Sequence, residues 1–182
     1  MRWGTAVATV LLGIVGACGQ SPAPTTRTGQ PVFVEGRDAD FALAMQIGSD
    51  VVDAGAPVDV AAILTWEGAN PTATIWASGS GPVSFRLGQI DGTIALGGAM
   101  TADCATHDYT RLAPVAVPFR KSGGFSADDP NAGFYRAFFA DPVLRLPAGR
   151  WRVTANLNGF LVPCEMNAPE VDLTLQAEIL VR

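Results

Sequence analysis

The sequence predicts an all-β domain built as an antiparallel sandwich of about nine short strands. Hydrophobic residues alternate with small or polar residues at a period of two, and no segment carries a sustained helical stripe. Clusters of turn-forming residues separate these segments at intervals of about 8 to 12 residues, as in β-sandwiches and partly closed barrels. Of these two architectures we expect the sandwich.

The first half of the domain holds five expected strands. They cover residues 41–47, 58–66, 72–77, 83–87 and 93–96. The turn sequence Asp53–Pro57 precedes the second strand, and Ser78–Pro82 follows the third. The pair Asp91-Gly92 predicts a tight hairpin turn between the fourth and the fifth strands.

The second half continues the alternation. Strands are expected over residues 109–112, 113 or 115 to 119, 134–139, 151–158 and 171–180. Asn158-Gly159 is another pair typical of tight turns, so the strand that begins at Trp151 should end there.

A long connection over residues 120–133 leads into an aromatic segment. Its 14 residues exceed the usual loop length of about 4 to 6, which indicates a functional or mobile loop. In the expected strand 134–139, aromatic side chains would point to both faces, so both faces must be covered. The core would cover one face, and a partner, another copy of the chain or the long loop itself would cover the other. The candidate partner-binding residues are Phe125, Phe134, Tyr135, Phe138 and Phe139.

The first 18 residues carry a pattern of export. Arg2 supplies one positive charge, and residues 3–17 contain no charged side chain but are too short for a membrane span of about 20 residues. Val15, Gly16 and Ala17 then place an aliphatic, a small and a very small residue directly before Cys18. This segment resembles a bacterial lipoprotein signal, which implies cleavage before Cys18 and a lipid on its sulfur. An ordinary signal peptide with a cysteine at the junction is the alternative.

The resemblance implies a division of the chain and a location. Residues 1–17 would be the lipoprotein signal peptide, residues 18–36 a lipid-anchored flexible tether, and residues 37–182 the sandwich domain. Residues 19–31 contain no large apolar side chain and are rich in Pro, Ser, Thr and Gly, a composition typical of tethers. The protein would then sit in the cell envelope, held to a membrane by lipid and facing outside the cytoplasm, on the outer membrane if the organism has one.

Charge and cysteine content narrow the function further. The chain has 17 Asp and Glu against 12 Lys and Arg, a net charge of −5, which argues against a nucleic-acid partner. Besides Cys18 it holds only Cys104 and Cys164, an even pair that predicts a disulfide in an exported domain. Two free thiols are the alternative.

The sequence gives little indication of a metal site or of a catalytic site. His107 is the only histidine and stands near Asp103, Cys104 and Asp108, which are metal-ligating residue types. One histidine cannot complete a copper centre, and zinc would require reduced Cys104, so we expect no metal, no cofactor and a solvated loop. No Gly-x-Ser-x-Gly motif is present, and no catalytic residue is assigned. The segment 128–133 lacks the ligand pattern of a calcium loop and predicts a turn.

A second resemblance concerns residues 144–155. Their order of leucine, proline, glycine, aromatic residue and alternating strand is similar to the start of a late strand in many immunoglobulin-like extracellular domains. Trp151 stands where Tyr is commoner, and its indole N–H needs a partner if buried. Cys104 and Cys164 fall in expected loops, so the disulfide should tie loops at an edge. A weaker resemblance is to a bacterial intracellular proteinase inhibitor family built on such a sandwich, whose activity is not carried over.

Together these features predict an interaction module. We expect a surface-anchored, non-enzymatic lipoprotein whose sandwich binds an envelope or extracellular partner, above all a protein, through its loops or through residues 134–139. Two alternatives remain open. One is an enzyme or enzyme inhibitor that acts on exported polymers, and the other is a structural spacer without a ligand.

Overall fold

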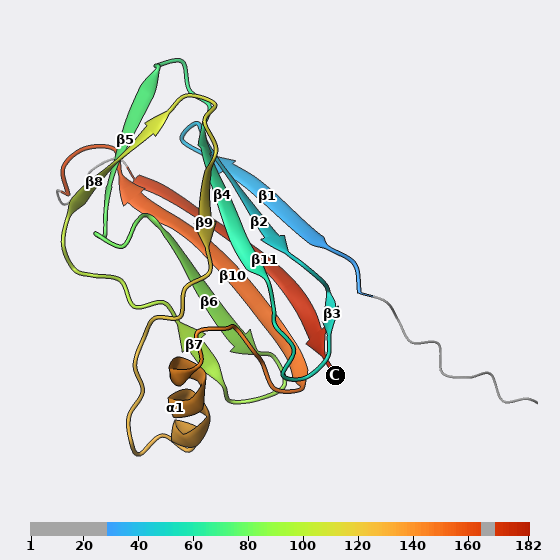
Figure 1. The fold of residues 1–182 in the computed structure, drawn as a ribbon. Helices are drawn as coiled ribbons and strands as arrows, with labels where there is room; N and C mark the ends of the chain where they lie inside the picture. Colours follow the sequence, from blue (N-terminus) through green and yellow to red (C-terminus); the bar gives the residue numbers. More distant parts are fainter. Residues whose placement is uncertain (1–28, 165–169) are drawn as a thin grey trace, which may run out of the picture.

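The computed structural model describes residues 29–164 and 170–182, which form two packed β-sheets and one short helix (Figure 1). This confirms the predicted all-β sandwich. The elements are β1 (Val32–Asp38), β2 (Phe41–Ile47), β3 (Val51–Val52), β4 (Val60–Trp66), β5 (Thr72–Ala77), β6 (Val83–Gln89), β7 (Ala95–Gly97), β8 (Ala105–Thr110), β9 (Val115–Pro118), α1 (Ala132–Ala140), β10 (Gly149–Phe160) and β11 (Glu170–Val181).

The smaller sheet has four antiparallel strands in the order β1-β2-β4-β9. Along β2 and β4, every second side chain is buried and the ones between are half-buried, which is the alternation read from the sequence. Because the inward positions hold large residues such as Phe41, Met45 and Leu64, this sheet contributes one wall of the core.

The larger sheet has seven strands. Its order is β3-β11-β10-β5-β8, with β6 beside β10 and β7 beside β6. The strands β10 and β11 have 12 residues each and pair along their whole length, while β3 adds a short parallel pairing at the end of β11. As predicted, Asp91-Gly92 lies in the connection between the antiparallel strands β6 and β7.

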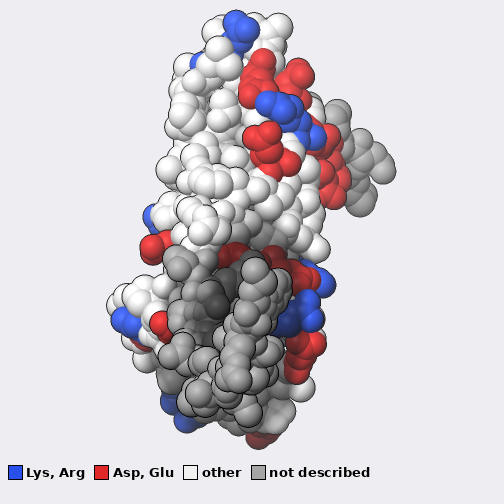
Figure 2. All heavy atoms as spheres, turned by 90° about the vertical axis from the view of Figure 1, so that its right-hand side faces the viewer, with Lys and Arg blue, Asp and Glu red and all other residues white. Residues whose placement is uncertain are grey.

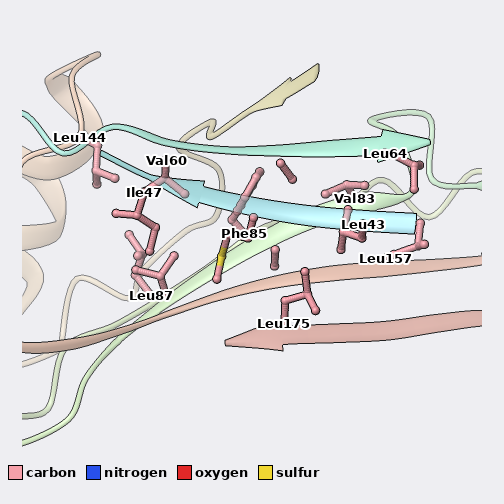
Figure 3. Close-up of a cluster of buried hydrophobic side chains, with 14 of the residues drawn as sticks. Leu43, Ile47, Val60, Leu64, Val83, Phe85, Leu87, Leu144, Leu157 and Leu175 are labelled. Atoms are coloured by element: carbon pink, nitrogen blue, oxygen red, sulfur yellow. The ribbon is translucent and has the colours of Figure 1, made fainter. Parts of the chain in front are cut away.

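The core lies between the two sheets. Trp151 is fully buried, and its indole Nε1–H donates to the carbonyl oxygen of Pro147 at 3.0 Å, which supplies the partner that a buried indole requires. Figure 3 shows side chains from the two sheets meeting face to face, among them Leu43, Ile47, Val60 and Leu64 from the smaller sheet and Val83, Phe85, Leu87, Leu157 and Leu175 from the larger one.

A disulfide joins Cys104 to Cys164, with their Cα atoms 6.1 Å apart. Cys104 directly precedes β8 and Cys164 lies in the bend after β10, so the bond ties two connections at the edge of the larger sheet, as expected. The sequence separation is 60 residues, and closing a loop of that length stabilises a domain by about 4 kcal/mol in the chain-entropy account.

The aromatic segment is a helix, so the predicted strand 134–139 is wrong. In α1 the buried residues are Ala132, Tyr135 and Phe138, which recur every three residues as on one face of a helix. The aromatic run is apolar at both two-residue and three-to-four-residue spacing, and packing against the core selects the helix.

Three smaller expectations are also corrected. The first strand begins at Val32, so residues 32–36 belong to β1 and not to the tether. His107 lies in β8 and not in a loop. Asn158-Gly159 lies inside β10 instead of forming a turn, because the strand continues past it to reach β5 at Phe160.

Candidate functional site

A groove of about 820 Å³ opens where the outer face of the smaller sheet meets the segment Asp141–Leu144. β9 pairs with one end of β4, and the backbone just before β4 instead meets residues 144–145, with Val58 N–H donating to Leu144 O at 2.9 Å. The residue after β9 still reaches this edge, because Phe119 N–H donates to Val60 O at 3.0 Å. The two segments therefore meet the strand on either side of Asp59, and Asp59 and Val60 both line the groove. A volume of this size is typical of pockets that enclose a ligand.

The floor of the groove is one row of outward-facing residues. Phe33, Gln46, Ala61 and Pro118 pair in that order across β1, β2, β4 and β9, and all four line the groove. Phe33 is the most prominent of them, since 69% of its surface is exposed, the highest value among the large hydrophobic residues described. Apart from the amide of Gln46, the row offers an apolar contact surface without a charged side chain.

The next row of the same face is also largely apolar. Ala44, Ile63 and Ala116 follow the edge residue Glu35 across the sheet. The groove therefore continues into an outward face of small apolar side chains, which soluble domains seldom leave open over a wide area.

The outer face of the larger sheet is different. There Arg150 and Arg152 on β10 hold the Glu178 carboxylate of β11 at 2.9 and 3.3 Å, and the bond from Arg150 is the main cause of the lowered pKa of Glu178. Figure 2 shows acidic and basic side chains side by side near the upper end of one side of the molecule, with uncharged residues below them. This contrast makes the apolar face of the smaller sheet the distinctive outer surface.

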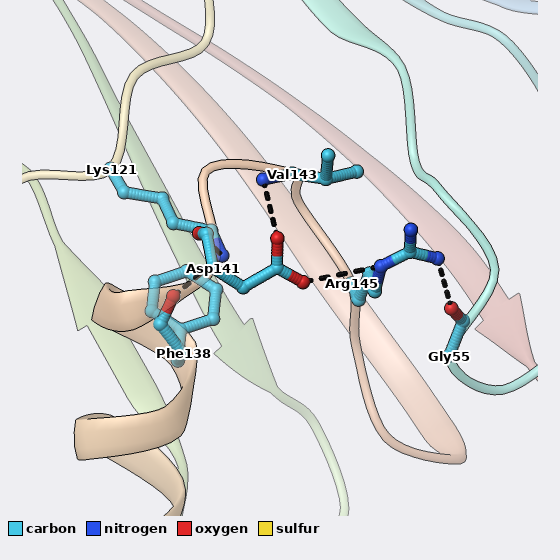
Figure 4. Close-up of polar contacts among 6 residues, drawn as sticks. All are labelled: Gly55, Lys121, Phe138, Asp141, Val143 and Arg145. Carbon is cyan, nitrogen blue, oxygen red and sulfur yellow. Dashed lines mark hydrogen bonds and ion pairs between the residues drawn. The ribbon is translucent and has the colours of Figure 1, made fainter.

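Lys121 fixes one wall of the groove to the end of α1. Its Nζ donates to the carbonyl oxygens of Phe138 and Asp141, both at 2.6 Å, and lies 4.0 Å from the centre of the Phe138 ring (Figure 4). A cation is favourable there because the last carbonyls of a helix lack partners and carry partial negative charge. Burial lowers the pKa of Lys121.

Asp141 and Arg145 fix the other part of that wall. The Asp141 carboxylate accepts the backbone N–H of Val143 at 2.8 Å and Nε–H of Arg145 at 3.2 Å, and the Arg145 Nη1 donates to the carbonyl oxygen of Gly55 at 2.7 Å. The Val143 bond is the main reason why the pKa of Asp141 is lowered. Because these bonds hold the wall in place, a ligand would meet a preformed groove.

Two charged residues at the groove remain available to a ligand. Asp59 and Arg120 line it, and neither forms an ion pair within the described ranges 29–164 and 170–182. Both are exposed. An apolar ligand could therefore carry polar groups of either sign at its ends.

The structure brings the five predicted aromatic residues together, although mainly as packing. Phe125 of the long loop stacks on Phe139 with ring centres 6.2 Å apart, and it also contacts Tyr135 at 5.7 Å. Tyr135 and Phe138 are almost fully buried, and Phe134 packs on both of them. Of the five residues, only Phe139 lines the groove. The long loop of the domain itself thus covers the aromatic residues of α1, which is one of the coverings expected from the sequence.

His107 contributes to a loop contact. Its Nε2 lies 2.9 Å from the carbonyl oxygen of Ser78, and Asp103 accepts the backbone N–H of Gly79 at 3.0 Å. The hydroxyl of Thr101 is the main cause of the lowered pKa of Asp103. Since the histidine ring faces a carbonyl oxygen and not a hydroxyl, this geometry holds two loops together and does not activate a nucleophile. In the two ranges that the structure describes, no three potential metal ligands gather.

Sequence reasoning missed the groove residues, among them Phe33, Ala61 and Val143. The available signal was the outward half of the alternation, because residues 42, 44, 61 and 63 are Ala and Ile where a solvated face usually carries polar groups.

Cys18 and most of the expected tether lie outside the described residues. Within the described part, no helix has the length and apolar character needed to cross a membrane. No protein-family model matches the chain, and no curated protein has a similar sequence.

Proposed function

We propose that this chain is a non-enzymatic lipoprotein of the cell envelope, anchored through Cys18, whose groove on the smaller sheet binds a partner protein. One observation carries the proposal, namely the preformed groove whose apolar floor lies beside the exposed ring of Phe33. Large aromatic side chains next to a pocket are frequent centres of protein–protein binding.

The position of the groove supports a role for the anchor. The described chain starts at Gly29, and Pro31 and Phe33 already line the groove. A lipid on Cys18 would keep this end of the sandwich near the bilayer, where partners in the same membrane are concentrated. The partner would insert an apolar group into the groove and place polar groups near Asp59 and Arg120.

Photo-crosslinking in intact cells of the source organism tests the binding surface. Benzoylphenylalanine replaces Phe33 in one variant and Leu180 in a control, because Leu180 is also an exposed hydrophobic residue but lies on β11 of the other sheet. We expect a discrete adduct with a second protein from position 33 and none from position 180. Equal or absent adducts at both positions would reject the groove as the binding surface.

A separate experiment tests the anchor. Cells fed an alkyne analogue of palmitate should label the wild-type protein and leave a Cys18→Ser variant unlabelled. The wild-type protein should also partition into the detergent phase. An unlabelled wild-type chain would reject the lipoprotein assignment while leaving the crosslinking result interpretable.

A further inference from the structure

The groove lies where the lipid anchor would join the domain. Its lining combines a majority of apolar residues with a wall fixed by Lys121 and Asp141. Pro31, two residues after the start of the described chain, is part of that lining. A group attached to the chain shortly before Gly29 is therefore held close to the opening of the groove.

We propose that the acyl chain on Cys18 docks in this groove of its own domain when it is not in a bilayer, an inference that rests on the lipoprotein function proposed above. The lipid would thus be the first occupant of the partner-binding site. Once the lipid enters a membrane, the groove is released for the partner protein. Membrane insertion would then control partner binding.

The length of the connecting chain permits this docking. Cys18 precedes Gly29 by eleven residues, most of them Pro, Ser, Thr, Gly or Ala. Random-coil statistics for eleven residues of this composition give a span of about 18 Å, which corresponds to an effective concentration of the attached group in the millimolar range. Even a weak site for an alkyl chain would be filled under these conditions.

The chemistry of the groove suits an alkyl chain. Phe33, Ala61 and Pro118 offer carbon surfaces along it. Two of its charged lining residues, Lys121 and Asp141, are engaged with the protein itself, and the other two, Asp59 and Arg120, are exposed to solvent. An alkyl chain gains by leaving water, whether it enters the groove or a bilayer. A lipoprotein carries two or three acyl chains, and together these bind a bilayer more strongly than the groove binds one chain. The acyl chain therefore occupies the groove only when no bilayer is present.

The test attaches an alkyl chain to the protein in vitro. Cys18 is the only cysteine outside the disulfide, so a maleimide with a long alkyl chain ending in pyrene can be coupled to it in the folded chain that starts at Cys18. Pyrene monomer emission reports an apolar surrounding, and excimer emission reports contact between chains of different molecules. We expect monomer emission typical of an apolar site, independent of protein concentration.

Two variants of one residue type identify the groove. Ala61→Glu places a carboxylate on the floor, whereas Ala44→Glu places one on the same half-buried face outside the groove. We expect the docked fraction to fall at least about tenfold in Ala61→Glu and to stay at the wild-type level in Ala44→Glu, because an alkyl chain cannot cover an unpaired charge without loss. Circular dichroism verifies that both variants fold, and should Ala61→Glu not fold, Ala61→Ser serves in its place.

Two results would overturn the inference, namely excimer emission in the wild type and equal docking in both variants. If position 33 crosslinks to a partner protein but the attached alkyl chain stays in water, the docking of the lipid is disproved and the proposed partner binding is not. Absence of palmitate labelling in cells instead disproves the lipoprotein function.

Discussion

Gly159 provides a sharp test of how closely two strands of the larger sheet, β10 and β5, approach each other. It lies in β10 next to β5, and a Cβ atom there would overlap Cγ2 of Ile75 and approach the carbonyl oxygen of Trp76 to 3.1 Å. The glycine is therefore required by a close approach of two strands and not by a turn. We predict that Gly159→Ala destabilises the domain.

The magnitude follows from two opposing effects. Forcing a methyl group into a packed site costs about 1–3 kcal/mol, while replacing glycine by alanine restricts the unfolded chain and returns about 0.4–1 kcal/mol. The expected net loss is about 1–2 kcal/mol in the free energy of unfolding. Gly88→Ala is the matched control, because Gly88 is also in a strand and a Cβ atom there meets nothing within 4 Å.

A double-mutant cycle identifies the cause. Ile75 is fully buried, so Ile75→Ala alone should cost about 2–5 kcal/mol, but the cavity it leaves gives room to the methyl group that Gly159→Ala introduces. The double variant should be more stable than the sum of the two losses predicts, by about 1–2 kcal/mol. Urea unfolding followed by tryptophan fluorescence measures all four proteins. Additive losses, or a Gly159→Ala variant as stable as the wild type, would refute the close-approach argument.

Three further predictions concern backbone strain and pH. Ala39 and Asp40 both have positive φ, 45° and 64°, so the joint change Ala39→Asn and Asp40→Gly should raise the free energy of unfolding by about 1 kcal/mol in urea titrations. Leu112 has φ 57° and is 63% exposed, and Leu112→Asn should raise the thermal midpoint because it relieves strain and loses little packing. Burial raises the pKa of Tyr109 to about 12 from 10.0, so stability should fall as pH rises above 10.0, and Tyr109→Phe should remove that part of the decline.

The strands were predictable where one face alone is buried. In β2 and in residues 151–157 of β10 the alternation of apolar residues with small or polar ones matches the burial of the structure, because a strand with one covered face allows only that pattern. α1 was not predictable in the same way. Its aromatic residues satisfy both periods, and only contact with the core decides between them.

The groove was less accessible to sequence reasoning because its parts are distant in the chain. Ala61 on its floor and Val143 on its wall are 82 residues apart, and no local motif signals that β9 and the segment after α1 would meet the strand on either side of Asp59. The disulfide was easier, since Cys104 and Cys164 are the only cysteines after residue 18 and have only one way to pair with each other.

Small side chains explain how an apolar outer face can be in contact with water. Ala42, Ala44 and Ala61 expose only methyl groups between neighbouring strands, so the free-energy cost of their contact with water is small. A flat face of this kind also gives a partner little to hold, because binding energy comes from large groups in pockets. The energy must therefore come from what enters the groove beside Phe33. An apolar side chain of a protein and the alkyl chain of a lipid satisfy the same requirement, and this is why the two should compete for one site.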